Sequence, residues 1–113
     1  MQARKLTESY SVAPQILAAE VSSIAAEGYR SIMCNRPDGE QAGQPPYAEI
    51  AAAAAAQGLA VRHVPVVSGA ITPDDMDAFN LAIAELPSPV FAYCRSGARC
   101  TNLWQMSAAG QRS

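Results

Sequence analysis

The residues best suited to chemistry lie in one short segment near the end of the chain. A cysteine is followed by a loop that closes on an arginine: Cys94, Arg95, Ser96, Gly97, Ala98 and Arg99. Such a loop can turn several backbone N–H groups inward around an anion, and a glycine permits the left-handed turn that this requires. A free cysteine has a pKa of about 8.5, so loop N–H groups and an arginine are needed to make it a thiolate nucleophile at neutral pH.

A second interpretation of the same cysteine needs no chemistry. Free cysteines are among the most buried residue types, and Cys94 directly follows the apolar run VFAY, which is typical of a strand buried on both faces. The grouping of Cys94, Gly97 and Arg99 between a strand and a helix favours the anion-binding interpretation. We therefore expect an anion loop that includes the backbone of residues 95–100, with Cys100 as its last member, and Arg99 as its bidentate partner.

Strands and helices alternate in the pattern around this loop. Hydrophobic periodicity, glycine stops and proline breaks predict strands over 10–13, 29–35, 59–66 and 90–93. They predict helices over 14–27, 47–57 and 73–86, and a last helix that starts near Cys100. Right-handed crossovers then give an α/β fold: a small, mainly parallel, four- to five-stranded sheet with helices on both faces. We expect a single domain over residues 1–113, with Cys94 at the carboxyl end of a central strand, where α/β proteins bind ligands.

Composition narrows the possible functions. The chain has 113 residues and a net charge of −2, and its eight Lys and Arg residues are scattered, which argues against nucleic-acid binding. No apolar run approaches the roughly 18 residues that cross a bilayer, and residues 1–10 lack an apolar run, so we expect no secretory signal. An odd number of cysteines suggests no disulfide framework. We expect a cytoplasmic protein without membrane partners. The single histidine, His63, has no second metal-ligand pattern beside it, so we expect neither a metal nor another cofactor.

Wider motifs add a resemblance that extends from about Lys5 to Met106. The segments YSVAPQI, IMCNRPDGEQAGQP, HVPVVSGAITPDDMDAF and VFAYCRSGAR together resemble a bacterial phosphatase-like family. That family is related to dual-specificity phosphatases and is often fused to a β-lactamase-like hydrolase domain. The resemblance implies a dual-specificity-phosphatase-like fold, Cys94 as nucleophile, Arg99 as the anion-binding arginine, and a fused or partner hydrolase domain.

The chain departs from the phosphatase pattern within the loop. Only four residues separate Cys94 from Arg99. Phosphatase loops of this kind have one more, and the shorter length is typical of rhodaneses, which carry a persulfide on the cysteine. The hydroxyl residue that usually follows the arginine is replaced by Cys100, with Thr101 as a substitute one position later.

The general acid is the second departure. The loop at 67–70, where dual-specificity phosphatases place an aspartate, contains no acid. Asp74 and Asp75 fit the first turn of a helix, where acids are favoured by the helix dipole. Asp38 is the better candidate for the catalytic acid, because its loop should overhang the Cys94 loop, although Asp-Gly is also a common turn pair. Arg36 in the same loop is a candidate for adding positive charge at the mouth of the anion site.

Three functions remain open at this stage. The first is hydrolysis of phosphate monoesters, for example phosphotyrosine or aryl phosphates, through a cysteinyl-phosphate on Cys94. The second is sulfur transfer, in which Cys94 accepts a sulfane sulfur and passes it to a thiol. The third is a non-catalytic domain that binds an anion or a partner. All three predict that a small anionic group, from a phosphate ester or a sulfane sulfur donor, sits at the Cys94 loop.

Overall fold

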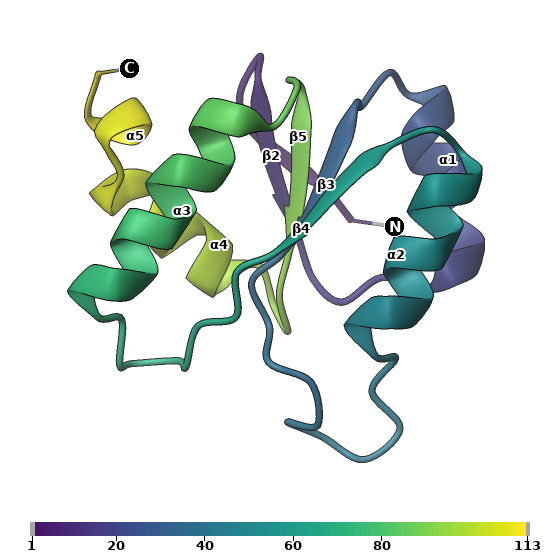
Figure 1. Ribbon diagram of the computed structural model, residues 1–113, viewed down its shortest axis with the longest axis horizontal. Helices are drawn as coiled ribbons and strands as arrows, with labels where there is room; N and C mark the ends of the chain where they lie inside the picture. The colour runs from purple at the N-terminus through teal and green to yellow at the C-terminus, as the bar shows by residue number, and fades with distance from the viewer. Residues whose placement is uncertain (1, 113) are drawn as a thin grey trace.

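A five-stranded sheet lies between two layers of helices in the computed structural model, which describes residues 2–112 (Figure 1). The strand order is β1-β2-β5-β3-β4. The first two strands pair antiparallel and all other pairs are parallel. The strands are β1 (Arg4–Thr7), β2 (Tyr10–Ala13), β3 (Ser31–Cys34), β4 (Ala60–His63) and β5 (Val90–Tyr93). The predicted mainly parallel sheet is therefore confirmed.

Helices cover both faces of this sheet, as predicted. One face carries η1 (Ala18–Glu20), α1 (Val21–Ala26) and α2 (Tyr47–Ala56). The other carries α3 (Pro73–Glu85), α4 (Ala98–Met106) and α5 (Ala108–Arg112). Each face has its own apolar core. On the α3 and α4 side, Tyr10 stacks on Trp104 with ring centroids 4.3 Å apart and meets Phe79 edge-on. On the other side, Tyr29 packs edge-on against Phe91.

The burial of the central strands explains why the apolar run VFAY correctly predicted strand β5. All four residues of β2, β3 and β5 are buried, whereas the edge strand β4 is only half-buried. A strand with neighbours on both sides and helices on both faces must be apolar throughout. β5 lies between β2 and β3, so Cys94 emerges from the middle of the sheet.

Several elements differ from the sequence prediction. The strands predicted over 29–35 and 59–66 are shorter, at Ser31–Cys34 and Ala60–His63. Strand β1 was not predicted, because the polar segment RKLT lies on an exposed antiparallel edge. The helix predicted from Pro14 begins only at Ala18, because Gln15 is still in extended contact with the Cys94 loop, where its N–H donates to the carbonyl of Arg95. Helix α4 begins at Ala98, two residues before the predicted start at Cys100.

The loops that follow β2, β3, β4 and β5 all lie at one edge of the sheet, the lower edge in Figure 1. This is the carboxyl edge, where open α/β sheets place their ligand sites. Within residues 2–112 no helix combines the length and the apolar character needed to span a bilayer.

Candidate active site around Cys94

The loop after β5 turns sharply into helix α4. Gly97 precedes the helix with a φ of 92°, in the left-handed region that side chains disfavour. A Cβ at this position would also lie 3.4 Å from the carbonyl carbon of Ala13, so the turn is pressed against the end of β2. The N–H of Cys94 donates to Ala13 O at 3.2 Å. The glycine thus allows the chain to reverse within a four-residue loop.

This turn directs hydrogen-bond donors at the sulfur of Cys94. The Gly97 N–H lies 3.0 Å from Cys94 Sγ, and the residue is completely buried. The side chain of Cys100 is the strongest influence and lowers the pKa of the Cys94 thiol. The backbone N–H groups of Cys100, Gly97 and Ser96 lower it further, whereas burial raises it. The resulting pKa is about 5, so Cys94 is a thiolate at neutral pH.

Cys100 occupies the place where the phosphatase pattern has a hydroxyl residue. Its thiol is buried and donates a hydrogen bond to Cys94, and burial with the adjacent sulfur raises its own pKa well above the usual range. Thr101, the other candidate for this task, turns away and donates to Gly97 O at 2.9 Å. The S–H of Cys100 therefore donates to Cys94 from the position where the phosphatase pattern has a hydroxyl residue.

Arg99 is held by a residue that sequence reasoning missed. Its Nη1 and Nη2 atoms donate to the two carboxylate oxygens of Glu40 at 2.7 and 2.9 Å, and Nη1 also donates to Val66 O at 2.8 Å. These bonds occupy one edge of the guanidinium. Among the described residues no acceptor takes the Nε–H, so the edge formed by Nε and Nη2 is available for an oxyanion.

Glu40 also joins Arg36 to the site. Arg36 Nε donates to Glu40 Oε1 at 2.9 Å, and its other nitrogens donate to side-chain oxygens of Gln15 and Gln41. Arg36 is only 2% exposed. The hydrogen bond from Arg99, with further help from Arg36, lowers the pKa of Glu40 to about 2. Arg36 thus lies beneath the site as a support for Glu40, whereas we had expected it at the mouth.

A pocket of about 490 Å³ opens above this network. It is lined by Glu40, Ser68, Arg95, Ser96, Ala98 and Arg99. Glu40 is the only acidic residue among these lining residues, and its carboxylate stays ionised between two guanidinium groups. The pocket therefore offers positive charge and N–H donors to an anion, and no carboxylic acid that could donate a proton.

Comparison with known proteins places the chain in a family. Residues 2–111 match the family described as the phosphatase-like domain of beta-lactamase hydrolase-like proteins. The chain belongs to this family. A beta-lactamase hydrolase-like protein of Agrobacterium fabrum is 38% identical over 109 residues, which is 96% of this chain and 25% of that protein. The phosphatase-like domain thus spans about a quarter of the length of this curated relative.

Solved structures agree with this assignment. A protein of Neisseria meningitidis described as a candidate phosphatase is 39% identical to the phosphatase-like domain, with a TM-score of 0.81. The match covers 88% of this chain and 71% of that one. The core catalytic domain of a PP-IP phosphatase of Saccharomyces cerevisiae has a TM-score of 0.65 at 11% identity, over 84% of this chain and 56% of that one, and shows the fold alone. The expected phosphatase-like fold is therefore confirmed.

The predicted acid of this phosphatase-like domain lies away from the pocket. Asp38 is exposed, and its Oδ1 accepts a hydrogen bond from the N–H of Tyr47 at 2.8 Å, at the first residue of α2. Asp75 exchanges hydrogen bonds with Thr72 in a capping box at the start of α3. The loop of Asp38 does approach the Cys94 loop, as expected, but it contributes Glu40 there.

The side chains of His63 and Cys34 make contacts that stabilise the fold. His63 is half-buried on β4, stacks on Tyr47 at 4.4 Å and lies 2.9 Å from Arg36 O, in keeping with the predicted strand residue. Cys34 donates to Arg36 O at 3.3 Å. Among residues 2–112 no group of three His, Cys, Asp or Glu side chains is arranged to hold a metal.

Proposed function

We propose that this domain is a cysteine-dependent phosphatase that hydrolyses phosphate monoesters through a cysteinyl-phosphate intermediate. The observation that carries the proposal is the buried thiolate of Cys94, with a pKa of about 5, at the start of the loop whose following residues, Arg99 among them, line the pocket. The phosphatase-like family and its structural neighbours support the same reaction class. The proposed substrates are small esters, such as aryl phosphates or phosphotyrosine.

In the proposed first step, Cys94 Sγ attacks phosphorus, an S–P bond forms and the P–O bond to the leaving group breaks. The free Nε and Nη2 edge of Arg99 and the N–H groups of the loop stabilise the negative charge on the phosphoryl oxygens. In the second step, water attacks phosphorus and Cys94 leaves as a thiolate. The hydrogen bond from Cys100 stabilises the thiolate in both the resting enzyme and this departure.

The leaving group sets the expected limits of this activity. The one carboxylate at the pocket, Glu40, has a pKa of about 2 and is bound to two arginines, so it holds no proton to give. Asp38 accepts the hydrogen bond that caps α2. We therefore expect faster hydrolysis of aryl phosphates, whose leaving oxygen needs little protonation, than of alkyl phosphates.

Sulfur transfer is the second candidate, and the absence of a proton donor among the residues lining the pocket favours it. Cys94 would attack the outer sulfur of thiosulfate, so that an S–S bond forms and sulfite leaves with the electron pair. The thiolate of an acceptor would then attack that outer sulfur, form a new persulfide and release Cys94 as a thiolate. Neither step needs a general acid, and the four-residue loop matches the length found in rhodaneses.

One pair of measurements tests both candidates. The first is turnover of nitrophenyl phosphate by the wild type, Cys94→Ser and the matched control Cys34→Ser. The second is the intact mass of each protein after incubation with thiosulfate. Phosphatase activity predicts turnover that Cys94→Ser lowers by about a thousandfold or more, the scale of losing a nucleophile, and that Cys34→Ser retains.

The opposite results separate the alternatives. Turnover that survives in Cys94→Ser would refute the cysteine mechanism. A mass gain of one sulfur atom on the wild type and on Cys34→Ser, without ester turnover, would favour sulfur transfer. Thermal stabilisation by phosphate with neither reaction would identify a non-catalytic anion-binding domain.

A further inference from the structure

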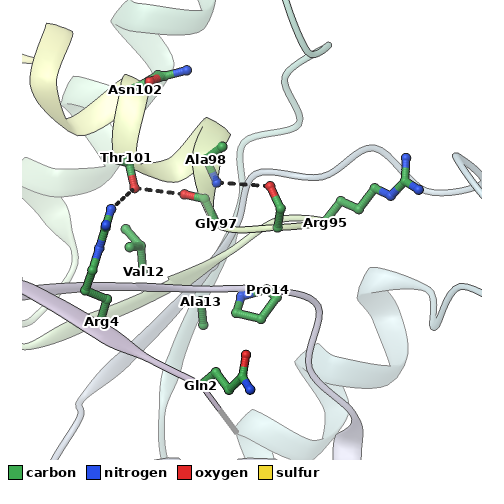
Figure 2. A pocket seen from close by; sticks show the side chains of 11 residues that line it. Gln2, Arg4, Val12, Ala13, Pro14, Arg95, Gly97, Ala98, Thr101 and Asn102 are labelled. Atoms are coloured by element: carbon green, nitrogen blue, oxygen red, sulfur yellow. Dashed lines mark hydrogen bonds between the residues drawn. The ribbon is translucent and has the colours of Figure 1, made fainter.

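A second cleft adjoins the Cys94 loop (Figure 2). Its volume is about 700 Å³, and it is formed by the N-terminal segment, the end of β2 and the first turn of α4. Arg95, Ser96 and Ala98 line both this cleft and the pocket above Arg99. The loop is therefore a shared wall of two adjoining cavities.

The charges along this second cleft are unbalanced. Arg4 and Arg95 line it, and none of the lining residues is acidic. Within residues 2–112 neither of these two arginines has a carboxylate partner. By contrast, Arg36, Arg62 and Arg99 each bind one. In a chain of net charge −2, these two unpaired cations beside one cleft favour an anionic ligand there.

Arg4 is tied to the loop wall itself. Its Nη2 donates to Thr101 Oγ1 at 3.2 Å, and Thr101 Oγ1 in turn donates to Gly97 O at 2.9 Å (Figure 2). The backbone of Arg4 is fixed by pairing with Val12 across the β1–β2 hairpin. Most of the N–H donors of this guanidinium thus remain free while its position is already restricted, which lowers the entropy lost on binding.

The lining between the charged groups is partly apolar and partly polar, with Gln2, Ser96, Thr101 and Asn102 as its uncharged polar members. Val12 and Ala13 at the end of β2, Pro14 after it and Ala98 at the start of α4 all line the cleft (Figure 2). Figure 2 also shows Arg4 and Arg95 on opposite sides of the Gly97 turn. Such a lining suits the carbon skeleton of a ligand whose acidic group reaches Arg4.

We propose that this cleft binds a second acidic group of the substrate, a phosphate or a carboxylate, with Arg4 as its main partner. The substrate class is then an organic phosphate with two acidic groups joined by a short carbon skeleton. One acidic group lies at Cys94 and Arg99, and the other lies across the loop at Arg4. This inference rests on the proposed function for the group that reacts, and adds a specificity site to it.

Binding to Cys94→Ser protein tests the inference without turnover. Calorimetry would compare phenyl phosphate, which has one acidic group, with carboxyphenyl phosphate and phenylene bisphosphate, which have two. We expect the two-acid ligands to bind about fivefold to tenfold more tightly, the scale of a charge-assisted hydrogen bond at an exposed site. The ranking of the two ligands identifies carboxylate or phosphate as the preferred second group.

Substitution of Arg4 then locates the effect. Arg4→Met in the Cys94→Ser background keeps the aliphatic part of the side chain and should bring the affinity ratio close to unity. Arg4→Lys, which keeps the charge, should retain part of the preference. Arg30→Met is the matched control, because Arg30 is also exposed and without a carboxylate partner within residues 2–112 but does not line the cleft, and it should leave the ratio unchanged.

The outcomes separate this inference from the proposed function. Equal affinities for all three ligands, or an equal loss in Arg4→Met and Arg30→Met, would overturn the second site. A preference that depends on Arg4, in a wild-type protein that hydrolyses none of the esters, would refute the phosphatase and support the second site. Hydrolysis of the esters without any preference for two acidic groups would support the phosphatase and overturn the second site.

Discussion

Cys34 and Cys94 stand at the ends of neighbouring strands, on opposite faces of the sheet, and have opposite chemistry. Each lies at the carboxyl end of a central parallel strand, and the two strands are neighbours, with Cys34 paired to Tyr93. Both side chains are buried and both thiols are free. Yet the pKa of Cys94 is lowered to about 5, whereas burial raises the pKa of Cys34.

The chain that follows each cysteine accounts for the difference. After Cys94 a glycine turn and a helix start present N–H groups and the Cys100 thiol to the sulfur. After Cys34 the chain runs into an extended loop, and the thiol acts as a donor to a carbonyl, Arg36 O. A position at the carboxyl edge of a sheet is thus not enough for a reactive cysteine, because the local donors decide its protonation state.

The largest expected effect is the separation of the two thiol titrations. Ultraviolet absorbance of the thiolate, taken as the difference between wild type and Cys94→Ser, should show a midpoint near pH 5. The difference between wild type and Cys34→Ser should show no ionisation of Cys34 at neutral pH. Because the thiolate is the reactive form, turnover should be level above about pH 6 and fall about tenfold for each unit below pH 5. A Cys94 midpoint above neutrality would contradict the comparison.

The free energy of unfolding should also depend on pH through the titration of Cys94. The pKa of Cys94 is lower in the folded state than in the unfolded chain, so the thiolate stabilises the fold fully only above the unfolded value of about 8.5. This contribution is lost as the pH falls from there towards 5. Urea midpoints of wild type minus Cys94→Ser should therefore rise with pH across this window.

A smaller effect is expected from Glu40→Gln, which sharpens the comparison because the Cys34 loop supplies this residue to the Cys94 site. Arg99 would keep its bond to Val66 O but lose its paired carboxylate. We expect kcat to fall about tenfold to a hundredfold through misplacement of Arg99. The KM for an anionic substrate should not rise, because the guanidinium groups of Arg36 and Arg99 then carry positive charge that Glu40 no longer balances.

The matched control for this variant is Glu49→Gln, an exposed acid in the first turn of α2. It should leave kcat and KM unchanged. A loss of kcat in Glu40→Gln that is matched by a large fall in melting temperature would indicate a purely structural role.

The smallest effect on turnover at neutral pH is expected from Cys100→Ala, which removes the S–H donor from Cys94 but leaves the backbone N–H donors in place. Loss of one hydrogen bond to the thiolate should raise the pKa of Cys94 by about one to two units. Cys100→Ser restores an O–H donor and should titrate close to wild type. Equal midpoints in the alanine and serine variants would show that the backbone N–H groups alone hold the thiolate.

The sequence was most informative where local patterns decide structure. The VFAY strand, the helix that starts at residue 73 and the alternation of strands and helices all follow from neighbouring residues, and they match the structure. β1 was missed because three of its four residues are polar and the segment forms a strand only through pairing with β2. The late start of the first helix reflects a contact between Gln15 and Arg95, which are distant in sequence.

The same division holds at the site. Cys94, Gly97 and Arg99 lie within one loop, so their grouping is visible in the sequence. Glu40 is 59 residues from Arg99 and has the local character of a solvated loop acid. Its bond to Arg99 depends on β3 and β5 being adjacent, which only the assembled sheet determines. Cys100 follows Cys94 by only six residues, so their contact is local. A second cysteine at the start of the helix, six residues after the cysteine at the strand end, was the sequence signal for it.

The shared carboxylate of Glu40 has a consequence for protein engineering. The guanidinium of Arg99 is balanced by a residue on the neighbouring loop, and that residue is itself bound by Arg36, which Gln15 holds from a third loop. A designer who grafts only the Cys94 loop onto another α/β scaffold would transfer the arginine without its counter-charge. The portable unit is the pair of loops after β3 and β5, with the end of β2 as its base.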